Sequence, residues 1–128
     1  MENFPQKLAQ DTLEKIIAFL IFKKIISSKH KITIVIKNIS EKEIKKLNQK
    51  YRKKNEPTDI LSFGYQFDKN ILEGDLLLCW GIIRKNAKED NIKSEQELKK
   101  NLIHGCLHLT GLEHSKEMFE LQADFLKI

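Results

Sequence analysis

The chain has 128 residues, of which 41% are hydrophobic and 32% are charged, and its formal net charge is +5. This length suits one domain, so we expect residues 1–128 to form a single domain around one core. No apolar run is long enough for a transmembrane helix, since Lys23 and Lys24 interrupt residues 16–26. The first residues lack the basic start and cleavage site of a secretory signal, which predicts a cytoplasmic protein.

The positive charge is concentrated in the first half of the chain. Residues 1–56 hold 14 Lys and Arg against 6 Asp and Glu, whereas residues 57–128 hold 9 against 12. The densest basic segment contains Lys42, Lys45, Lys46, Lys50, Arg52, Lys53 and Lys54. Such a segment would attract phosphate groups, although a solvated helix face is an equally good interpretation.

The first predicted elements are a helix and a strand. Helical spacing predicts a helix over residues 7–26 that forms one wall of the core through its apolar residues Leu13, Ile16, Ile17, Leu20, Ile21 and Phe22. A polar linker follows, in which we expect His30 to be exposed. The next apolar residues alternate along the chain, which predicts a strand with one buried face formed by Ile32, Ile34 and Ile36.

A second helix and two strands follow. Ser40 and Glu43 form a capping box that predicts a helix over residues 41–53, burying Ile44, Leu47 and Tyr51. Pro57 ends the basic loop. We expect strands at residues 58–65 and 74–79, separated by a turn region at 66–73, with Gly64 marking a bulge or the end of the first strand.

Three helices complete the chain. A short one is predicted over residues 82–89, and a capping box of Ser94 and Glu97 starts the next. Ser115 caps the last helix, whose apolar contacts are Met118, Phe119, Leu121, Phe125 and Leu126. The order of elements predicts a compact α+β domain with a small mixed sheet packed against several helices.

Three of the four histidines lie within eleven consecutive residues. His104 and His108 are four residues apart, so on a helix their side chains emerge about 40° apart around the axis and roughly 6 Å apart along it. Gly111 stands where the helix should end and can take a left-handed turn that brings His114 back toward the pair. The spacing predicts three nitrogen ligands for one divalent ion; the alternative is histidines without a ligand.

Three imidazoles suit zinc and leave one coordination position for water, which is typical of catalytic zinc. The metzincin peptidases share this spacing but carry a catalytic glutamate directly after the first histidine. Gly105 stands at that place, so a peptidase would lack its general base. Cys106 points away from the two helical histidines and is expected to be a small buried hydrophobe.

Four segments in the same order resemble the motifs of the YbeY family, described as metal-dependent bacterial endoribonucleases that act in ribosomal RNA maturation. They are Asn-Gln-Lys-Tyr-Arg at 48–52, Pro-Thr-Asp-Ile-Leu-Ser-Phe at 57–63, Gly-Asp-Leu at 74–76 and the histidine motif at 104–114. The likeness runs from about Ile32 to the end of the chain.

The resemblance assigns roles to single residues. It implies that His104, His108 and His114 bind zinc, and that Arg52 is an arginine near the metal that could hold the charge of a phosphodiester transition state. A salt bridge at a helix end is the alternative for Arg52. Asp59 and Asp75 match acidic positions, where turn capping or support of a histidine is more plausible than direct catalysis.

Two positions depart from the family pattern. Leu112-Glu113 stands where Tyr-Asp is typical, and Gly64 where proline is common. Glu113 keeps a carboxylate that could orient His114 or accept a proton from metal-bound water, and an exposed loop glutamate is the alternative.

The resemblance implies a single-strand-specific, zinc-dependent endoribonuclease acting in maturation of the 3′ end of 16S ribosomal RNA and in ribosome quality control. One Zn²⁺, or another divalent metal, would deliver hydroxide or polarise a phosphate oxygen while Arg52 stabilises charge. The expected partners are single-stranded and ribosomal RNA and the ribosome or its small subunit, with no membrane and no DNA. The alternative is a non-catalytic, zinc-containing ribosome-assembly factor, which a fourth protein ligand on the ion would favour.

Overall fold

The computed structural model describes residues 3–128. These residues form α1 (Gln6–Phe22), β1 (Lys31–Asn38), α2 (Glu41–Arg52), β2 (Ile60–Phe67), β3 (Ile71–Leu78), α3 (Trp80–Glu89), α4 (Ser94–Leu109) and α5 (Lys116–Leu126). The elements confirm the predicted α+β class. None of the helices in this part of the chain has both the length and the apolar character that a bilayer-spanning segment requires.

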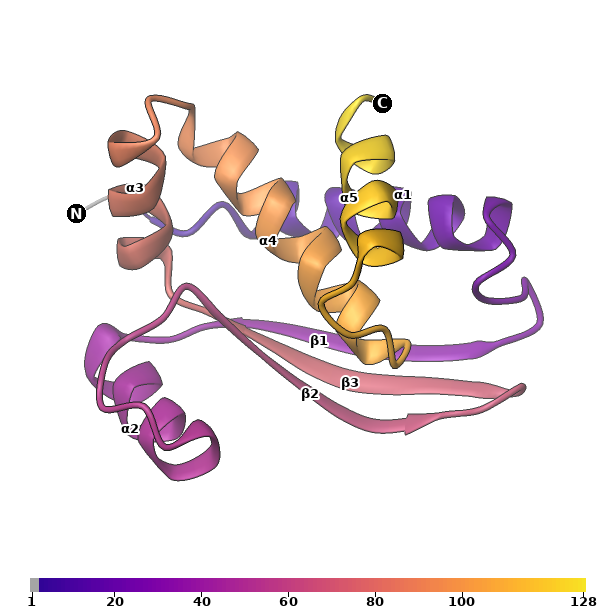
Figure 1. Cartoon of the computed structure of the whole chain (residues 1–128), viewed down its shortest axis with the longest axis horizontal. Helices are drawn as coiled ribbons and strands as arrows, with labels where there is room; N and C mark the ends of the chain where they lie inside the picture. Colours follow the sequence, from indigo (N-terminus) through magenta and orange to yellow (C-terminus); the bar gives the residue numbers. More distant parts are fainter. Residues whose placement is uncertain (1–2) are drawn as a thin grey trace.

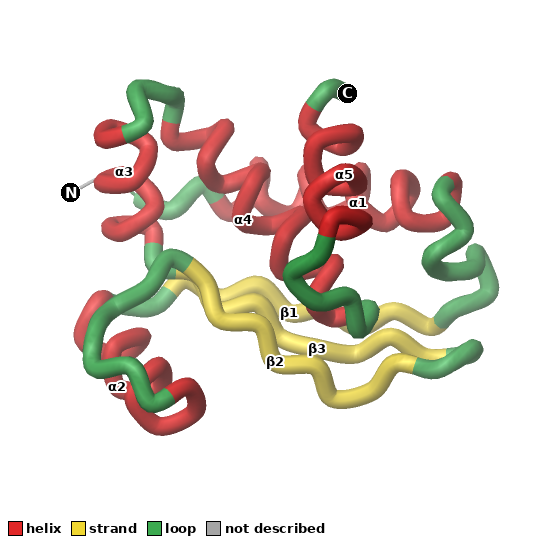
Figure 2. The backbone as a smooth tube through the Cα atoms, viewed as in Figure 1, coloured by secondary structure: helices red, strands yellow, loops and turns green. Residues whose placement is uncertain are grey.

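The three strands form one mixed sheet. Its order is β1-β3-β2, with β1 parallel and β2 antiparallel to the central β3. Figures 1 and 2 show α2 on one side of the sheet and the other four helices on the opposite side. The pairing of β2 with β3 shifts between Gly64 and Gln66, so the predicted irregularity at Gly64 is a bulge within the strand.

Helix α4 is the centre of the larger hydrophobic core. It contacts β2 and β3 on one side and α1, α3 and α5 on the others. Fully buried members of this core are Ala9, Ile16, Leu20, Leu72, Leu76, Leu78, Ile83, Leu98, Leu102, Ile103, Leu107 and Met118. A smaller cluster of Ile44, Leu61 and Cys79 fills the space beneath α2 on the other face of the sheet.

Two glycines let α4 lie close to the sheet. A Cβ atom at Gly105 would be 2.7 Å from the Ile60 side chain and 2.8 Å from that of Leu76. A Cβ atom at Gly74 of β3 would be 2.6 Å from the Leu109 side chain. Larger residues at either place would push the helix away from the strands, so Gly105 stands at the peptidase glutamate position for a packing reason.

The first helix is shorter than predicted. It ends at Phe22 rather than near residue 26, because Lys24 adopts a left-handed conformation with φ 61°. The backbone N–H of Ile25 then donates to the Leu20 carbonyl at 2.9 Å, a turn that returns the chain toward β1. The prediction that Phe22 contributes to the core is wrong, since its side chain is 79% exposed.

The predicted turn at residues 66–73 is also too long. It is confined to residues 68–70, where Asp68 Oδ1 accepts the backbone N–H groups of Asn70 and Ile71 at 2.8 and 2.9 Å. His30 is half-buried rather than exposed: its Nε2 lies 2.6 Å from the Asp68 carbonyl oxygen, and its ring stacks on Phe67.

Helix α2 matches its prediction at the start and differs near its end. Ser40 accepts the Glu43 N–H at 3.1 Å, and the Glu43 carboxylate accepts the Ser40 N–H at 3.4 Å, which completes the capping box. Ile44 is buried as expected, but Tyr51 is 56% exposed. Asn48 is buried instead, and its side-chain amide donates to the Glu56 carbonyl at 2.8 Å.

Of the capping residues predicted for the last two helices, the one for α4 is wrong and the one for α5 is confirmed. The capping box that begins α4 uses Gln96, whose side chain accepts the Lys93 N–H at 3.4 Å, and Glu97 is a buried residue of the helix. Ser115 caps α5 by accepting the Met118 N–H at 3.2 Å. Met118 and Phe125 supply buried apolar contacts as predicted, whereas Phe119 and Leu126 are exposed.

Candidate metal centre

The three histidines of the motif converge on one point. His104 and His108 lie on α4, and His114 lies in the loop before α5. Their Nε2 atoms form a nearly equilateral triangle, with separations of 3.1 Å for His104–His108, 3.1 Å for His104–His114 and 3.3 Å for His108–His114. The predicted ligand set therefore comes together in the folded chain.

This triangle fits a metal ion. Two nitrogen ligands held about 2.0–2.1 Å from one ion in a tetrahedral arrangement lie roughly 3.3 Å apart. The three imidazoles could therefore hold a single divalent ion with little rearrangement. Within residues 3–128, the ligand cluster contains these three side chains and no Cys, Asp or Glu.

The end of α4 explains how His114 reaches the pair. Gly111 has φ +83°, a left-handed conformation that favours glycine, and its N–H donates to the His108 carbonyl at 2.9 Å. The Leu112 N–H donates to the Leu107 carbonyl at 3.2 Å, which closes the end of the helix. The chain then reverses direction, and His114 returns over the last turn of α4.

Two of the rings are oriented through their other nitrogen. Nδ1 of His104 lies 3.0 Å from Gln122 Oε1, and Nδ1 of His108 lies 3.1 Å from the Leu112 carbonyl oxygen. Both partners are acceptors, so each Nδ1 carries the proton and each Nε2 presents its lone pair to the centre of the triangle. This is the tautomer that a metal requires.

Burial also favours the neutral imidazoles. It lowers the pKa of His104 and of His108, and the neighbouring imidazoles lower both pKa values further. A low pKa keeps the rings unprotonated at neutral pH, so protons compete less with a metal ion. In contrast, burial raises the pKa of the Cys106 thiol to about 12, which agrees with the expectation of a buried, inert side chain.

His114 has a different environment. It is exposed, and its ring lies nearly parallel to that of Phe119, with an angle of 14° and 6.0 Å between the ring centroids. Phe119 was expected to supply apolar contacts of the last helix, and the structure places its exposed ring against the His114 ring instead. This stacking limits the rotation of the His114 ring.

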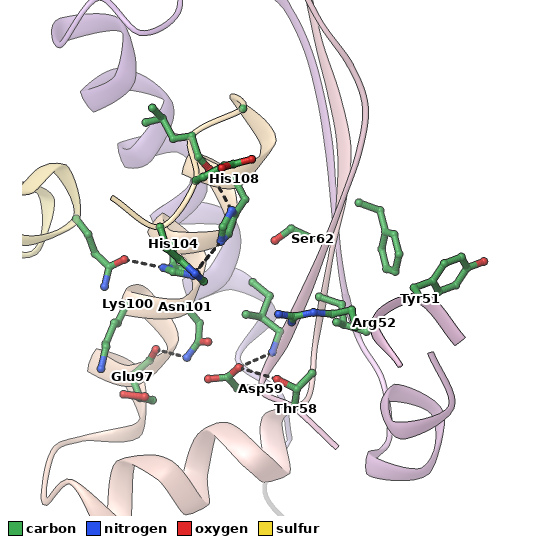
Figure 3. A pocket seen from close by; sticks show the side chains of 18 residues that line it. Tyr51, Arg52, Thr58, Asp59, Ser62, Glu97, Lys100, Asn101, His104 and His108 are labelled. Carbon is green, nitrogen blue, oxygen red and sulfur yellow. Dashed lines mark hydrogen bonds between the residues drawn. The ribbon is translucent and has the colours of Figure 1, made fainter. Parts of the chain in front are cut away.

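The three imidazoles open into a cleft of about 800 Å³ (Figure 3). Its walls come from the end of α2, the start of β2, helix α4 and the loop before α5. Arg52 and Lys100 are the positively charged residues among its lining side chains, and Asp59, Glu97 and Glu113 are the acidic ones. The cleft therefore places charged side chains of both signs around the histidine triangle.

Arg52 lines this cleft from the last turn of α2. Its side chain is exposed, and within residues 3–128 no carboxylate forms an ion pair with it, so the alternative of a helix-end salt bridge is not supported. Burial and the two other imidazoles are the larger causes of the lowered pKa of His108, and the positive charge of Arg52 lowers this pKa further. Arg52 therefore lies close enough to His108 to disfavour its protonated form.

The three acidic residues selected from the sequence differ in their position relative to the cleft. Glu113 lines the cleft and is exposed, and none of the hydrogen bonds among residues 3–128 joins it to His114. Asp59 also lines the cleft, where its Oδ1 accepts the Ile60 N–H at 2.9 Å, as a turn-capping residue does. Asp75 is outside the cleft and accepts the Tyr65 hydroxyl at 2.6 Å, and none of the hydrogen bonds within residues 3–128 joins it to a histidine.

Sequence reasoning missed two polar residues of the site. Glu97 is 4% exposed, its Oε2 has no hydrogen-bond partner among residues 3–128, and burial raises the pKa of its carboxyl. Glu97 is seven residues before His104, so helical spacing could have placed it on the same face. Gln122 comes from α5, and no local pattern indicated its contact with His104.

Comparison of the sequence with known proteins indicates one family. Residues 2–128 match the family model described as endoribonuclease YbeY. A relative named endoribonuclease YbeY from Thermotoga maritima is 39% identical, and the aligned region covers 99% of this chain and 79% of that protein. One of the same name from Polynucleobacter asymbioticus is 34% identical, covering 90% and 79%.

A solved structure is also similar. The solution structure of the Thermotoga maritima protein TM1509 superposes with a TM-score of 0.66 at 36% identity, covering 98% of this chain and 83% of that one. The family match, the relatives and this shared fold all extend over nearly the whole chain. The chain therefore belongs to the endoribonuclease YbeY family.

Proposed function

We propose that the protein is a zinc-dependent endoribonuclease that hydrolyses phosphodiester bonds in single-stranded RNA. We further propose that it acts in the cytoplasm on ribosomal RNA bound in the ribosome or its small subunit, in 3′-end maturation of 16S RNA and in quality control. The observation that carries the proposal is the triangle of Nε2 atoms, opening into a cleft beside Arg52, in a member of this family.

The donor set supports zinc as the metal. Three imidazole nitrogens without a thiolate or carboxylate suit a borderline divalent ion, and three protein ligands leave one position open. Such an ion, when bound, supplies Lewis acidity and makes water a stronger nucleophile. His104, His108 and His114 would hold it, with Gln122 and the Leu112 carbonyl keeping two of the rings oriented.

The role proposed for Arg52 is charge stabilisation. Phosphodiester hydrolysis passes through a state in which negative charge accumulates on the phosphate oxygens, and a guanidinium can donate two hydrogen bonds to them. Arg52 is exposed in the cleft and has no competing carboxylate partner among residues 3–128, so its side chain is available for a phosphate. The exposed lysines of α2 and the following loop would attract the RNA backbone toward it.

The role proposed for Glu113 is that of a proton acceptor. Its carboxylate lines the cleft next to His114 in the chain and is unpaired within residues 3–128. A carboxylate with these properties could accept a proton from the attacking water.

The test separates metal binding from catalysis. Arg52→Ala should keep the metal, measured by elemental analysis after dialysis, and reduce kcat on a single-stranded RNA by about 10²- to 10³-fold. His104→Ala should remove both the metal and the activity. The control is Lys15→Ala, which removes an exposed positive charge from α1 and should cleave at the normal rate.

Each result has a clear meaning. If Arg52→Ala cleaves RNA as fast as the unmodified protein, the role of Arg52 is wrong. If the fully metal-loaded protein binds RNA but does not cleave it, the non-catalytic assembly factor replaces the nuclease.

A further inference from the structure

An aromatic pair from α2 and β2 lines part of the cleft. Tyr51 of α2 and Phe63 of β2 both line the cleft, and their ring centroids are 5.2 Å apart with an interplanar angle of 74°. We propose that this pair, which we call the aromatic platform, binds an unpaired nucleobase by stacking. The inference rests on the proposed function, because it names a binding site for the RNA substrate.

The exposure of Tyr51 is the first step. Its position in the apolar pattern of α2 predicts a buried side chain, yet it is 56% exposed and belongs to neither hydrophobic cluster. Phe63 is half-buried and packs against the smaller cluster beneath α2. A half-buried ring that packs against the smaller cluster thus supports one that faces solvent, so the platform is accessible and held in place.

The position of the platform is the second step. Tyr51 directly precedes Arg52 on α2, and Figure 3 shows Arg52 between the Tyr51 ring and the histidines. Phe63 follows Ser62, whose side chain approaches α4, so these neighbours in β2 point to opposite faces of the sheet. Since β2 is an edge strand, the cleft passes around this edge from the histidines to the platform. A phosphate beside Arg52 would place an adjacent base within reach of Tyr51.

The charges near the ring are the third step. Lys50 Nζ lies 5.2 Å from the centroid of the Tyr51 ring, a cation–π contact made by a flexible and exposed side chain. A base could take the place of the ammonium over the ring while Lys50 turns to a phosphate. Aromatic rings combined with nearby cations are typical of proteins that bind single-stranded nucleic acids.

The chemistry predicts a preference for unpaired RNA. A base within a duplex is stacked on its neighbours and has no free face for a protein side chain, whereas an unpaired base can turn out and stack. Stacking tolerates any base because each one has an aromatic face. The platform would thus select single strands without reading their sequence.

The test uses three variants of the metal-loaded protein and a short single-stranded RNA with phosphorothioate linkages that slow its cleavage. Tyr51→Leu keeps an apolar side chain over Phe63 but loses the ring, and Tyr51→Phe loses only the hydroxyl. The matched control is Phe22→Leu, which changes an aromatic residue that is 79% exposed at the end of α1. Fluorescence anisotropy gives the dissociation constants, and thermal melting and metal content show that each variant is folded.

We expect Tyr51→Leu to weaken RNA binding by roughly 5- to 150-fold, and Tyr51→Phe and Phe22→Leu to bind as the unmodified protein does. A set of RNAs with one base removed at successive positions should contain one RNA for which the loss caused by Tyr51→Leu disappears. That RNA lacks the base that stacks on the platform.

Other outcomes separate the two proposals. If the unmodified protein cleaves RNA and Tyr51→Leu binds it equally well, the platform is wrong and the nuclease stands. The platform is also wrong if Tyr51→Phe loses as much affinity as Tyr51→Leu, since the hydroxyl is then the contact. If the unmodified protein neither binds nor cleaves RNA, the proposed function itself fails.

Discussion

The candidate metal centre is built from two unlike halves. The helix half consists of His104 and His108, which lie on a helix packed tightly against the sheet and have hydrogen bonds at Nδ1. The loop half consists of His114, which is exposed and oriented by stacking on Phe119. The two halves differ in how much of their geometry exists before a metal binds.

The difference follows from backbone packing. Gly105 and Gly74 leave no room for a Cβ atom between α4 and the sheet, and most side chains on this part of α4 are buried, so close packing preorganises the helix half. The position of His114 depends on a few residues after Gly111. These residues are more exposed than α4, so fewer buried contacts hold them in place. A rigid pair with an adjustable third ligand allows the centre to close around an ion.

The largest expected effect comes from removing a ligand of the helix half. His104→Ala leaves one fixed imidazole and one on the loop, whereas His114→Ala leaves the preorganised pair intact. We therefore expect both variants to bind Zn²⁺ more weakly, by at least about 100-fold for His104→Ala and by less for His114→Ala. Titration calorimetry with metal-free protein measures both affinities. A larger loss for His114→Ala would overturn the distinction between the halves.

A smaller effect is expected from the groups that orient the rings. Gln122→Leu removes the acceptor that holds the Nδ1 proton of His104, and metal affinity should fall about 10- to 100-fold. Phe119→Leu removes only a stacking contact with His114, and its effect should be smaller. The same titration compares them, with Gln49→Leu on the exposed face of α2 as the control. Equal losses for Gln122→Leu and Phe119→Leu would mean that the loop half is as strictly oriented as the helix half.

The smallest expected effect is on the pH dependence of the free energy of unfolding, measured without metal. Burial lowers the pKa of His104 and of His108 in the folded protein. In the unfolded chain a histidine has a pKa of about 6.5, so below that pH the unfolded state binds more protons than the folded state does. The free energy of unfolding of the metal-free protein should be fully retained above about pH 6.5 and should decrease as the pH falls below it. His104→Ala should weaken this dependence, measured by urea denaturation across that range. An unchanged slope in the variant would show that His104 is not the titrating group.

Local signals predicted much of the site. The i, i+4 spacing of His104 and His108 and the left-handed turn at Gly111 are properties of a few consecutive residues, and they hold in the folded chain. The caps at Ser40 and Ser115 were predicted for the same reason. Predictions failed where two segments far apart in sequence meet, as for Tyr51, whose apolar pattern did not reveal that it faces the cleft.

By itself, the sequence determined which side chains can bind a metal, because helical geometry and one glycine relate three histidines within eleven residues. Only the tertiary structure decided what surrounds them. Gln122 reaches His104 from α5, and Arg52 and Tyr51 reach the cleft from α2. The physical reason is that these contacts depend on how α4 packs against the sheet and α5, which involves residues far apart in the chain and leaves no periodic pattern in any one segment.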